Sequence, residues 1–148
     1  MSIAVAIITS LSLKNIDPSV VMAVHKKAKQ YHIDPIVYHA LIMNESSYKP
    51  GAVNKAGNKG VKISSFGIGQ LTKSTAKWFC GISSEDDLVD VEKNLDCSAR
   101  YFSWQIKRYK GDLFKAISAY NAGSYVTWNK WYNEKVEHYI KKLRRTLE

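Results

Sequence analysis

The feature that most constrains the fold of this chain is a pair of Asp-Pro steps, each followed by apolar residues at helical spacing. Asp17 precedes Pro18, and Asp34 precedes Pro35. Aspartate is a favourable N-cap and proline suits the first helical position, so each step predicts the start of a helix. The second helix is expected to bring Glu45 to its C-terminal end. The apolar residues behind these predictions are Val20, Val21, Val24 and Ala28 after the first step, and Ile36, Val37, Ala40 and Leu41 after the second.

The rest of the chain is predicted to be mainly helical, apart from one long loop. Residues 49–65 are rich in Lys, Gly, Asn and Ser, which favours an irregular loop of a kind that often carries function. Beyond it, apolar spacing and capping residues predict helices over about 74–79, from about 84, over about 95–109, over 112–123 and over about 129–145. We find no repeat, low-complexity tract or interdomain linker. The pattern predicts a mainly α, single-domain protein.

Composition limits the size and the partners of the domain. The chain has 148 residues, 45% of them hydrophobic, which is enough for one cored domain and too few for two of ordinary size. Its net charge of +9, from 22 basic and 13 acidic residues, favours anionic polymers such as nucleic acid, acidic membrane or wall polymers. No DNA- or RNA-binding motif accompanies the charge, so most of it is interpreted as a solvated basic surface, and no nucleic-acid partner is expected.

Two further features leave alternatives open. Residues 1–17 contain an apolar stretch that lacks the positive segment of a secretory signal and is too short to span a bilayer; it is either a degenerate signal or the first packed segment, with the domain proper over 18–148. Cys80 and Cys97 have neither metal-ligand nor Cys-x-x-Cys spacing, so they are either buried thiols or one bridge in an oxidising compartment.

Three short motifs occur in a fixed order along the chain: Glu45-Ser46, then Gly67-Ile68-Gly69-Gln70-Leu71, then Ala119-Tyr120-Asn121-Ala122-Gly123. Together they resemble the lytic transglycosylases of the goose-type lysozyme superfamily. Each motif alone is weak, but their ordered occurrence across most of a small domain is specific. The resemblance implies a lysozyme-like helical domain with a glycan-binding cleft, and an enzyme that acts on peptidoglycan strands.

The resemblance also assigns roles to residues. Glu45 is the expected catalytic acid, Gln70 an expected substrate ligand, and Asn54 stands where the family often has a serine. The family's methionine before the glutamine and Met-Pro after it are replaced here by Gly69 and Leu71-Thr72, which predicts a more open cleft floor. Asn121 either binds sugar or braces the helix end, and the glycines are either simple turns or sugar contacts. The expected substrate-binding residues are Ser46, Asn54, Ser65, Gly67, Gln70, Tyr120, Asn121 and Tyr139.

The chemistry that these residues imply depends on a single carboxyl group. Cleaving a glycosidic bond at neutral pH requires an acid whose pKa is raised by apolar surroundings, as expected for Glu45. A hydrolase normally needs a second carboxylate, yet residues 46–84 contain no Asp or Glu. In the resembled transglycosylases one glutamate acts first as acid and then as base, and the product is a 1,6-anhydromuramoyl end. The alternatives are a goose-type muramidase, using a remote carboxylate such as Asp96, Asp112, Glu134 or Glu137, or a non-catalytic peptidoglycan-binding module.

The remaining expectations concern ligands and setting. Trp128, Trp131 and Tyr132 follow the third motif and either extend the cleft or pack inward. The four histidines show no metal-binding spacing, so neither a metal nor a cofactor is expected. The resemblance implies a monomer without a stable membrane span, acting in the periplasm, the cell wall or outside the cell. Wall remodelling, a secretion or conjugation apparatus and phage lysis all fit a lone domain of this kind.

Overall fold

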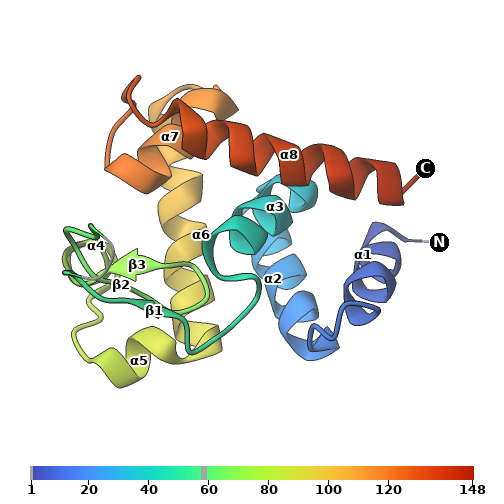
Figure 1. Ribbon diagram of the computed structural model, residues 1–148, viewed down its shortest axis with the longest axis horizontal. Helices are drawn as coiled ribbons and strands as arrows, with labels where there is room; N and C mark the ends of the chain where they lie inside the picture. The colour runs from blue at the N-terminus through green and yellow to red at the C-terminus, as the bar shows by residue number, and fades with distance from the viewer. Residues whose placement is uncertain (1, 58–59) are drawn as a thin grey trace.

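The computed structural model describes residues 2–57 and 60–148, and most of them lie in helices. Within this part of the chain three strands of two residues each pair in an antiparallel sheet of order β1-β2-β3. Figure 1 shows the helices gathered around α3 and α6, with the small sheet at one side. The elements are α1 (Ile3–Ser12), α2 (Pro18–Gln30), α3 (Pro35–Ser46), β1 (Val53–Asn54), β2 (Ser65–Phe66), β3 (Leu71–Thr72), α4 (Lys73–Cys80), α5 (Glu85–Val89), α6 (Val91–Arg108), α7 (Leu113–Ala122) and α8 (Lys130–Thr146).

The helix starts follow the predicted capping chemistry. Asp17 Oδ1 accepts a hydrogen bond from the Ser19 backbone N–H at 2.8 Å, and Asp34 Oδ1 accepts one from the Ile36 N–H at 2.9 Å. Each bond satisfies a backbone donor that has no partner inside its helix. The same chemistry begins α5, α6 and α7, whose caps are Ser84, Asp90 and Asp112. These starts confirm the helices expected from the sequence.

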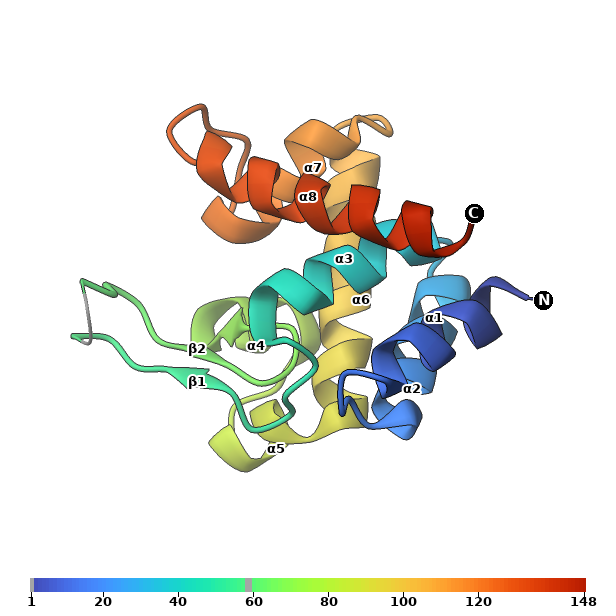
Figure 2. The ribbon, with the colours of Figure 1, turned by 45° about the vertical axis from the view of Figure 1, so that its right-hand side comes forward.

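The predicted irregular loop over 49–65 is partly regular. Val53 pairs with Phe66 and Asn54 with Ser65, so the loop contains β1 and leads into β2. In turn Ser65 pairs with Thr72 and Phe66 with Leu71. β1 and β2 lie side by side at the left of Figure 2, away from α1 and α8. Two-residue strands have no alternating apolar pattern to detect, and this is why the sequence did not reveal them.

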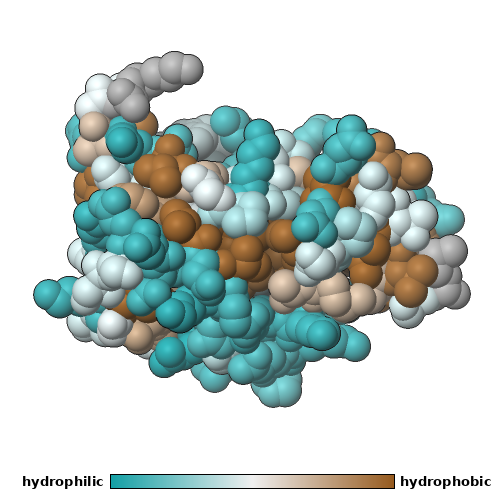
Figure 3. Space-filling model, turned by 90° about the horizontal axis from the view of Figure 1, so that it is seen from below, coloured by the Kyte–Doolittle hydropathy of each residue, from teal (hydrophilic) through white to brown (hydrophobic). Residues whose placement is uncertain are grey.

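The hydrophobic core lies around α3. This helix packs against α8 and α2, while α6 packs against α7 and α2. The side chains of Tyr38, Leu41 and Ile42 on α3 and of Leu95 and Phe102 on α6 are fully buried. On the face shown in Figure 3, hydrophobic surface forms a band across the middle of the molecule, bordered by hydrophilic residues. The core therefore fixes the C-terminal end of α3, where Glu45 lies.

The N-terminal apolar segment forms α1, which packs on α2 and α8 and buries Ile7 and Leu11. Its outward side chains Ile3, Val5 and Leu13 are exposed. None of the helices in the described residues is both long and apolar enough to cross a membrane.

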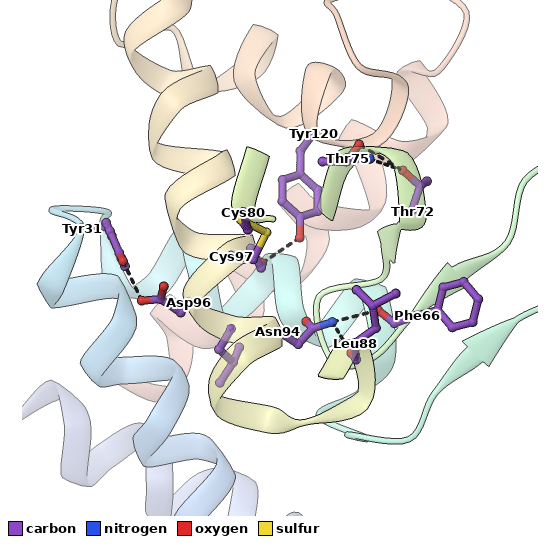
Figure 4. Close-up of a disulfide and its surroundings, with 12 residues drawn as sticks. Tyr31, Phe66, Thr72, Thr75, Cys80, Leu88, Asn94, Asp96, Cys97 and Tyr120 are labelled. Atoms are coloured by element: carbon purple, nitrogen blue, oxygen red, sulfur yellow. Dashed lines mark hydrogen bonds between the residues drawn. A yellow bond between two sulfur atoms is a disulfide. The ribbon is translucent and has the colours of Figure 1, made fainter. Parts of the chain in front are cut away.

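Cys80 and Cys97 form a disulfide bond. Of the two alternatives left open by the sequence, the bridge is therefore the one that the structure contains. It joins the last residue of α4 to the second turn of α6, as Figure 4 shows. The bridge fixes α4 against α6 beside the cleft described below.

Candidate active-site cleft

A cleft of about 380 Å³ brings together segments that are far apart in the sequence. Its walls come from the end of α3, from β2 to the start of α4, from α6, and from the end of α7. All three predicted motifs contribute to it. The lining residues are Glu45, Ile63, Ser65, Gln70, Leu71, Thr72, Ser74, Thr75, Tyr101, Tyr120, Asn121, Ala122 and Gly123.

Glu45 lies in the last turn of α3, where the helix ends at Ser47 in a left-handed conformation with φ of 51°. Its Oε1 accepts a hydrogen bond from the hydroxyl of Tyr132 on α8, a buried residue. Loss of hydration raises the pKa of Glu45 to about 7, although the Tyr132 hydrogen bond acts in the opposite direction. The carboxyl group therefore holds a proton over much of the range below neutral pH, as a general acid requires.

No other carboxylate shares this cleft among the described residues that line it. Asp96 faces α2, where its Oδ1 accepts hydrogen bonds from Tyr31 and Lys27. Asp112 caps α7, and Glu134 lies on the exposed surface of α8 near Lys130. Glu137, the last of the four remote candidates, is also exposed. The sequence left these four acids as possible partners of Glu45, and the structure brings none of them into the cleft lining.

Gln70 lies in the cleft wall, and its amide is fully engaged within the protein. Its Nε2 donates to the backbone carbonyls of Ala52 at 3.0 Å and Gly67 at 2.8 Å. Its Oε1 accepts from Asn54 Nδ2 at 2.8 Å and from Ser65 Oγ at 2.6 Å. These four bonds use both donors and both lone pairs of the amide. The polar residues predicted around Gln70 are thus brought together, and they hold the β1–β3 segment in shape.

Tyr120 forms the floor of the cleft between α6 and α7. Its hydroxyl donates to the Gly69 carbonyl at 2.7 Å and lies 2.7 Å from Ser98 Oγ. In Figure 4 the hydroxyl points away from α7 toward α6. The ring lines the cleft while the hydroxyl ties the second motif to α6. Beside it, Asn121 lines the cleft, and its Oδ1 accepts from Asn129 at 3.1 Å, so it both faces the cleft and braces the turn after α7.

Gly67 is required by packing on the side away from the cleft. Its φ is +76°, and a Cβ built on it would lie 2.2 Å from the Leu88 carbonyl oxygen and 2.3 Å from Asn94 Nδ2. Asn94 also donates to the carbonyls of Phe66 and Leu88. Both of these bonds appear in Figure 4. The absence of a side chain at Gly67 therefore lets the second motif dock on α6.

Four of the predicted site residues lie outside the cleft lining: Asn54 and Gly67, described above, and Ser46 and Tyr139. The Ser46 hydroxyl is directed back along α3 to the Ile42 carbonyl, 3.4 Å away. Tyr139 lines a separate hollow between α1, α3 and α8, together with Leu11 and Met43. Neither residue contacts the Glu45 carboxyl group in the hydrogen bonds of the described residues.

The sequence did not predict that Tyr132 contacts Glu45. Tyr132 and Tyr139 are seven residues apart on the inward side of α8, so helical periodicity places both on the same face. The motif resemblance selected Tyr139, whereas the residue that contacts Glu45 is Tyr132. Tyr101 was also missed as a cleft residue, because it belongs to the apolar face of α6 and no motif surrounds it.

No group of three or more His, Cys, Asp or Glu side chains that could hold a metal ion occurs in residues 2–57 and 60–148.

Comparison with known proteins gives consistent results. Residues 14–143 match the family model described as the Transglycosylase SLT domain. The chain is 30% identical over 110 residues to the membrane-bound lytic murein transglycosylase C of Sodalis glossinidius (strain morsitans), and 28% identical to the protein of the same name from Edwardsiella ictaluri (strain 93-146). Each alignment covers 68% of this chain but only 30% of the relative.

A solved structure shares the fold. The X-ray structure of an inactive mutant of lytic transglycosylase Slt from Pseudomonas aeruginosa superposes with a TM-score of 0.71 at 19% sequence identity, covering 85% of this chain and 24% of that one. This match confirms the predicted mainly α, lysozyme-like fold. The chain corresponds to about a quarter to a third of the length of these relatives.

Proposed function

The chain belongs to the Transglycosylase SLT domain family, and on this basis we propose that it is a peptidoglycan lytic transglycosylase with Glu45 as its catalytic residue. The substrate is the β-1,4 bond between N-acetylmuramic acid and N-acetylglucosamine. The product is a glycan with a 1,6-anhydromuramoyl end. The site of action is the periplasm, the cell wall or the cell exterior, and the protein acts as a monomer.

In the proposed reaction Glu45 acts twice. The protonated carboxyl group first transfers its proton to the glycosidic oxygen, and the bond between that oxygen and C1 of the muramic acid breaks. The Glu45 carboxylate then takes the proton of the C6 hydroxyl of the same sugar, and the O6 oxygen bonds to C1. No water is consumed, and Glu45 ends the cycle protonated, as it began.

One observation carries this proposal: Glu45 is the sole carboxylate among the described residues that line the cleft. A glycosidase that uses two carboxylates holds them roughly 5 to 10 Å apart across the bond, so the second acid would have to share the cleft. With one carboxyl group whose pKa lies at about 7, the same group can give and accept a proton near neutral pH.

The test is mass spectrometry of the fragments released from purified peptidoglycan. We expect fragments lighter by one water than reducing-end muropeptides, present with the parent protein and absent with Glu45→Gln. Glu134→Gln is the matched control, because Glu134 is an exposed acid on α8 outside the cleft lining, and it should release the same fragments as the parent. Reducing ends would identify a hydrolase, and binding without release would identify a non-catalytic module.

A further inference from the structure

A continuous series of aromatic rings leads out of the cleft along α6 and α4. Tyr120 and Tyr101 both line the cleft, and their ring centroids are 5.6 Å apart. Tyr101 in turn lies 6.1 Å from Trp104, almost parallel to it, and 5.6 Å from Phe79. The rings therefore form one series of contacts that starts at two cleft-lining residues and reaches Trp104 on α6 and Phe79 in the last turn of α4.

The outer end of this series is open to solvent. Trp78 is 67% exposed and Trp104 is 36% exposed, although indole rings are usually well buried. Their centroids are 5.7 Å apart and their planes meet at 77°, so the two rings form a right-angled corner. A flat apolar ring face beside a second ring is suited to one face of a sugar, whose axial C–H groups are apolar.

The corner is held in place by covalent and polar contacts. The Cys80–Cys97 bridge joins α4 to α6 two residues after Trp78 and four residues before Tyr101. Arg108 lies over the Trp104 ring at 5.4 Å and donates to the carbonyl of Gly123, a cleft residue, at 3.0 Å. The exposed rings therefore keep a fixed position relative to the cleft mouth, as a binding surface requires.

We propose that Trp78 and Trp104 form an outer subsite that binds a distal sugar of the same glycan strand whose scissile bond lies at Glu45. This proposal rests on the proposed function, because it assumes a glycan in the cleft. A polymer longer than a cleft of about 380 Å³ extends beyond it, and the exposed rings that follow the cleft-lining residue Tyr101 are those of Trp104 and, next to it, Trp78. Arg108 lies over Trp104, and Arg100 lies over Phe79, the next ring of the series; both side chains complement the carboxylates of stem peptides carried by such strands.

The position of this corner favours a glycan over a protein partner. The aromatic surface is not isolated, since Tyr101 belongs both to the ring series and to the cleft lining. A protein-docking surface would have no reason to be continuous with a sugar cleft. The length of the bound glycan therefore provides the critical test.

The experiment measures glycan affinity by calorimetry in the Glu45→Gln background, which prevents cleavage. The probes are a disaccharide and a hexasaccharide of β-1,4-linked N-acetylglucosamine. We expect Trp78→Ala combined with Trp104→Ala to weaken hexasaccharide binding by at least about fivefold and to leave disaccharide binding unchanged. Trp78→Phe, which keeps a ring, should retain most of the affinity. Trp128→Ala is the matched control, since Trp128 is also an exposed tryptophan but lies outside the cleft lining and the ring series.

Each other outcome overturns the subsite. Equal loss for both sugars would mean that the rings act by packing on the cleft, and no loss for either would leave the corner without a glycan role. If the parent protein released anhydro fragments from peptidoglycan but the double tryptophan variant bound the hexasaccharide with unchanged affinity, the proposed function would stand and only the subsite would be wrong. If the parent bound neither sugar and released nothing, the proposed function and the subsite would fail together. Thermal unfolding of each variant checks that the fold is kept.

Discussion

At the scale of single residues, the contact between Tyr132 and Glu45 influences the protonation of the one carboxyl group among the described residues that line the cleft. Burial favours the neutral acid, whereas the Tyr132 hydroxyl donates to the carboxylate and favours the charged form. The balance of the two gives the carboxyl group a pKa of about 7. In the proposed reaction a stronger hydrogen bond would leave too little acid at neutral pH, and a weaker one would make the carboxyl group a poorer proton donor in the first step.

Replacing Tyr132 with Phe removes the hydroxyl and keeps the ring. The pKa of Glu45 should then rise above about 7, because the interaction that lowered it is lost. Since the proposed first step needs protonated Glu45, the alkaline limb of the pH profile of kcat/KM should move to higher pH. The loss of an orienting hydrogen bond should also lower kcat/KM near pH 7 roughly fivefold to tenfold.

The matched control is Tyr139→Phe, which removes the hydroxyl of the other inward-facing tyrosine of α8. Tyr139 lines the hollow beside α1, so the alkaline limb should not move. A limb that stays in place in Tyr132→Phe would show that this hydroxyl does not influence the titrating group, and a limb that moves equally in both variants would point to a general effect on α8.

Gly67 is a residue whose lack of a side chain the packing of the fold requires. Its substitution by Ala places a Cβ 2.2 Å from a backbone oxygen in a left-handed conformation, and the free energy of unfolding should fall by about 3 kcal/mol. Gly111 has a similar φ of +85° and no atom within 4 Å of the corresponding Cβ, so Gly111→Ala should cost only about 1 kcal/mol. Urea unfolding of the two variants measures the difference. Equal losses would mean that the Leu88 contact is unimportant.

A site residue could be predicted where a short sequence motif surrounds it. It could not be predicted where only the folded structure brings it to the site. Glu45, Gln70 and Tyr120 were found because their neighbours in sequence form a motif, and all three line the cleft. The full internal bonding of Gln70 could not be foreseen, because Ala52 and Asn54 reach it only through the pairing of β1 with β2. The contact of Tyr132 with Glu45 spans 87 residues of sequence, and no local pattern encodes it.

At the scale of elements, α2 and α3 meet through a buried pair of histidines. His25 Nδ1 lies 3.2 Å from His39 Nε2, and His39 Nδ1 lies 2.8 Å from the Tyr48 hydroxyl. All three side chains are buried. Loss of hydration lowers the pKa of His39 to about 3, with a smaller contribution from His25, and it lowers the pKa of His25, with a smaller contribution from the charge of Lys29.

This pair should make the fold sensitive to mild acid. An unfolded histidine has a pKa of about 6.5, so the unfolded chain binds more protons than the folded one between that pH and about 3. Stability contributed by the neutral pair is therefore present above about pH 6.5 and is lost as the pH falls. At pH 5 the loss from His39 should be about 2 kcal/mol, measured as the change in the free energy of urea unfolding between pH 7 and pH 5.

His39→Gln should reduce this pH dependence, because glutamine does not titrate and can still accept or donate a hydrogen bond. His138→Gln replaces an exposed histidine of α8 and should leave the dependence as it is in the parent. A parent protein equally stable at both pH values would contradict the assignment, as would a His39→Gln variant with an unchanged slope.

The elements themselves were predictable to different degrees. The helices were predicted because caps such as Asp17, Asp34 and Asp112 act locally, within three residues of their own backbone partners. The strands were not, because a pair such as Val53 with Phe66 is stabilised by contacts between distant residues. The bridge between Cys80 and Cys97 was left open for the same reason, since it requires knowing that α4 lies against α6.

At the scale of the whole molecule, the excess of positive charge is the property that the cleft does not explain. The net charge of +9 is large for 148 residues, and its basic residues occur along most of the chain. Such a charge attracts an anionic polymer over a distance set by the ionic strength, about 10 Å at 0.1 M salt. Peptidoglycan whose stem peptides carry free carboxylates is a polymer of this kind.

The proposed function therefore predicts that salt affects the attraction to the wall more than the binding of sugar in the cleft. Raising the ionic strength from about 0.02 M to about 0.2 M should lower the rate of fragment release from intact sacculi roughly tenfold, because screening weakens long-range attraction. Affinity of the Glu45→Gln protein for the neutral hexasaccharide should change little over the same range, since a neutral sugar is held by short-range contacts. If salt weakened both equally, its effect would lie in the cleft itself, and if it weakened neither, the basic surface would have no part in finding the substrate.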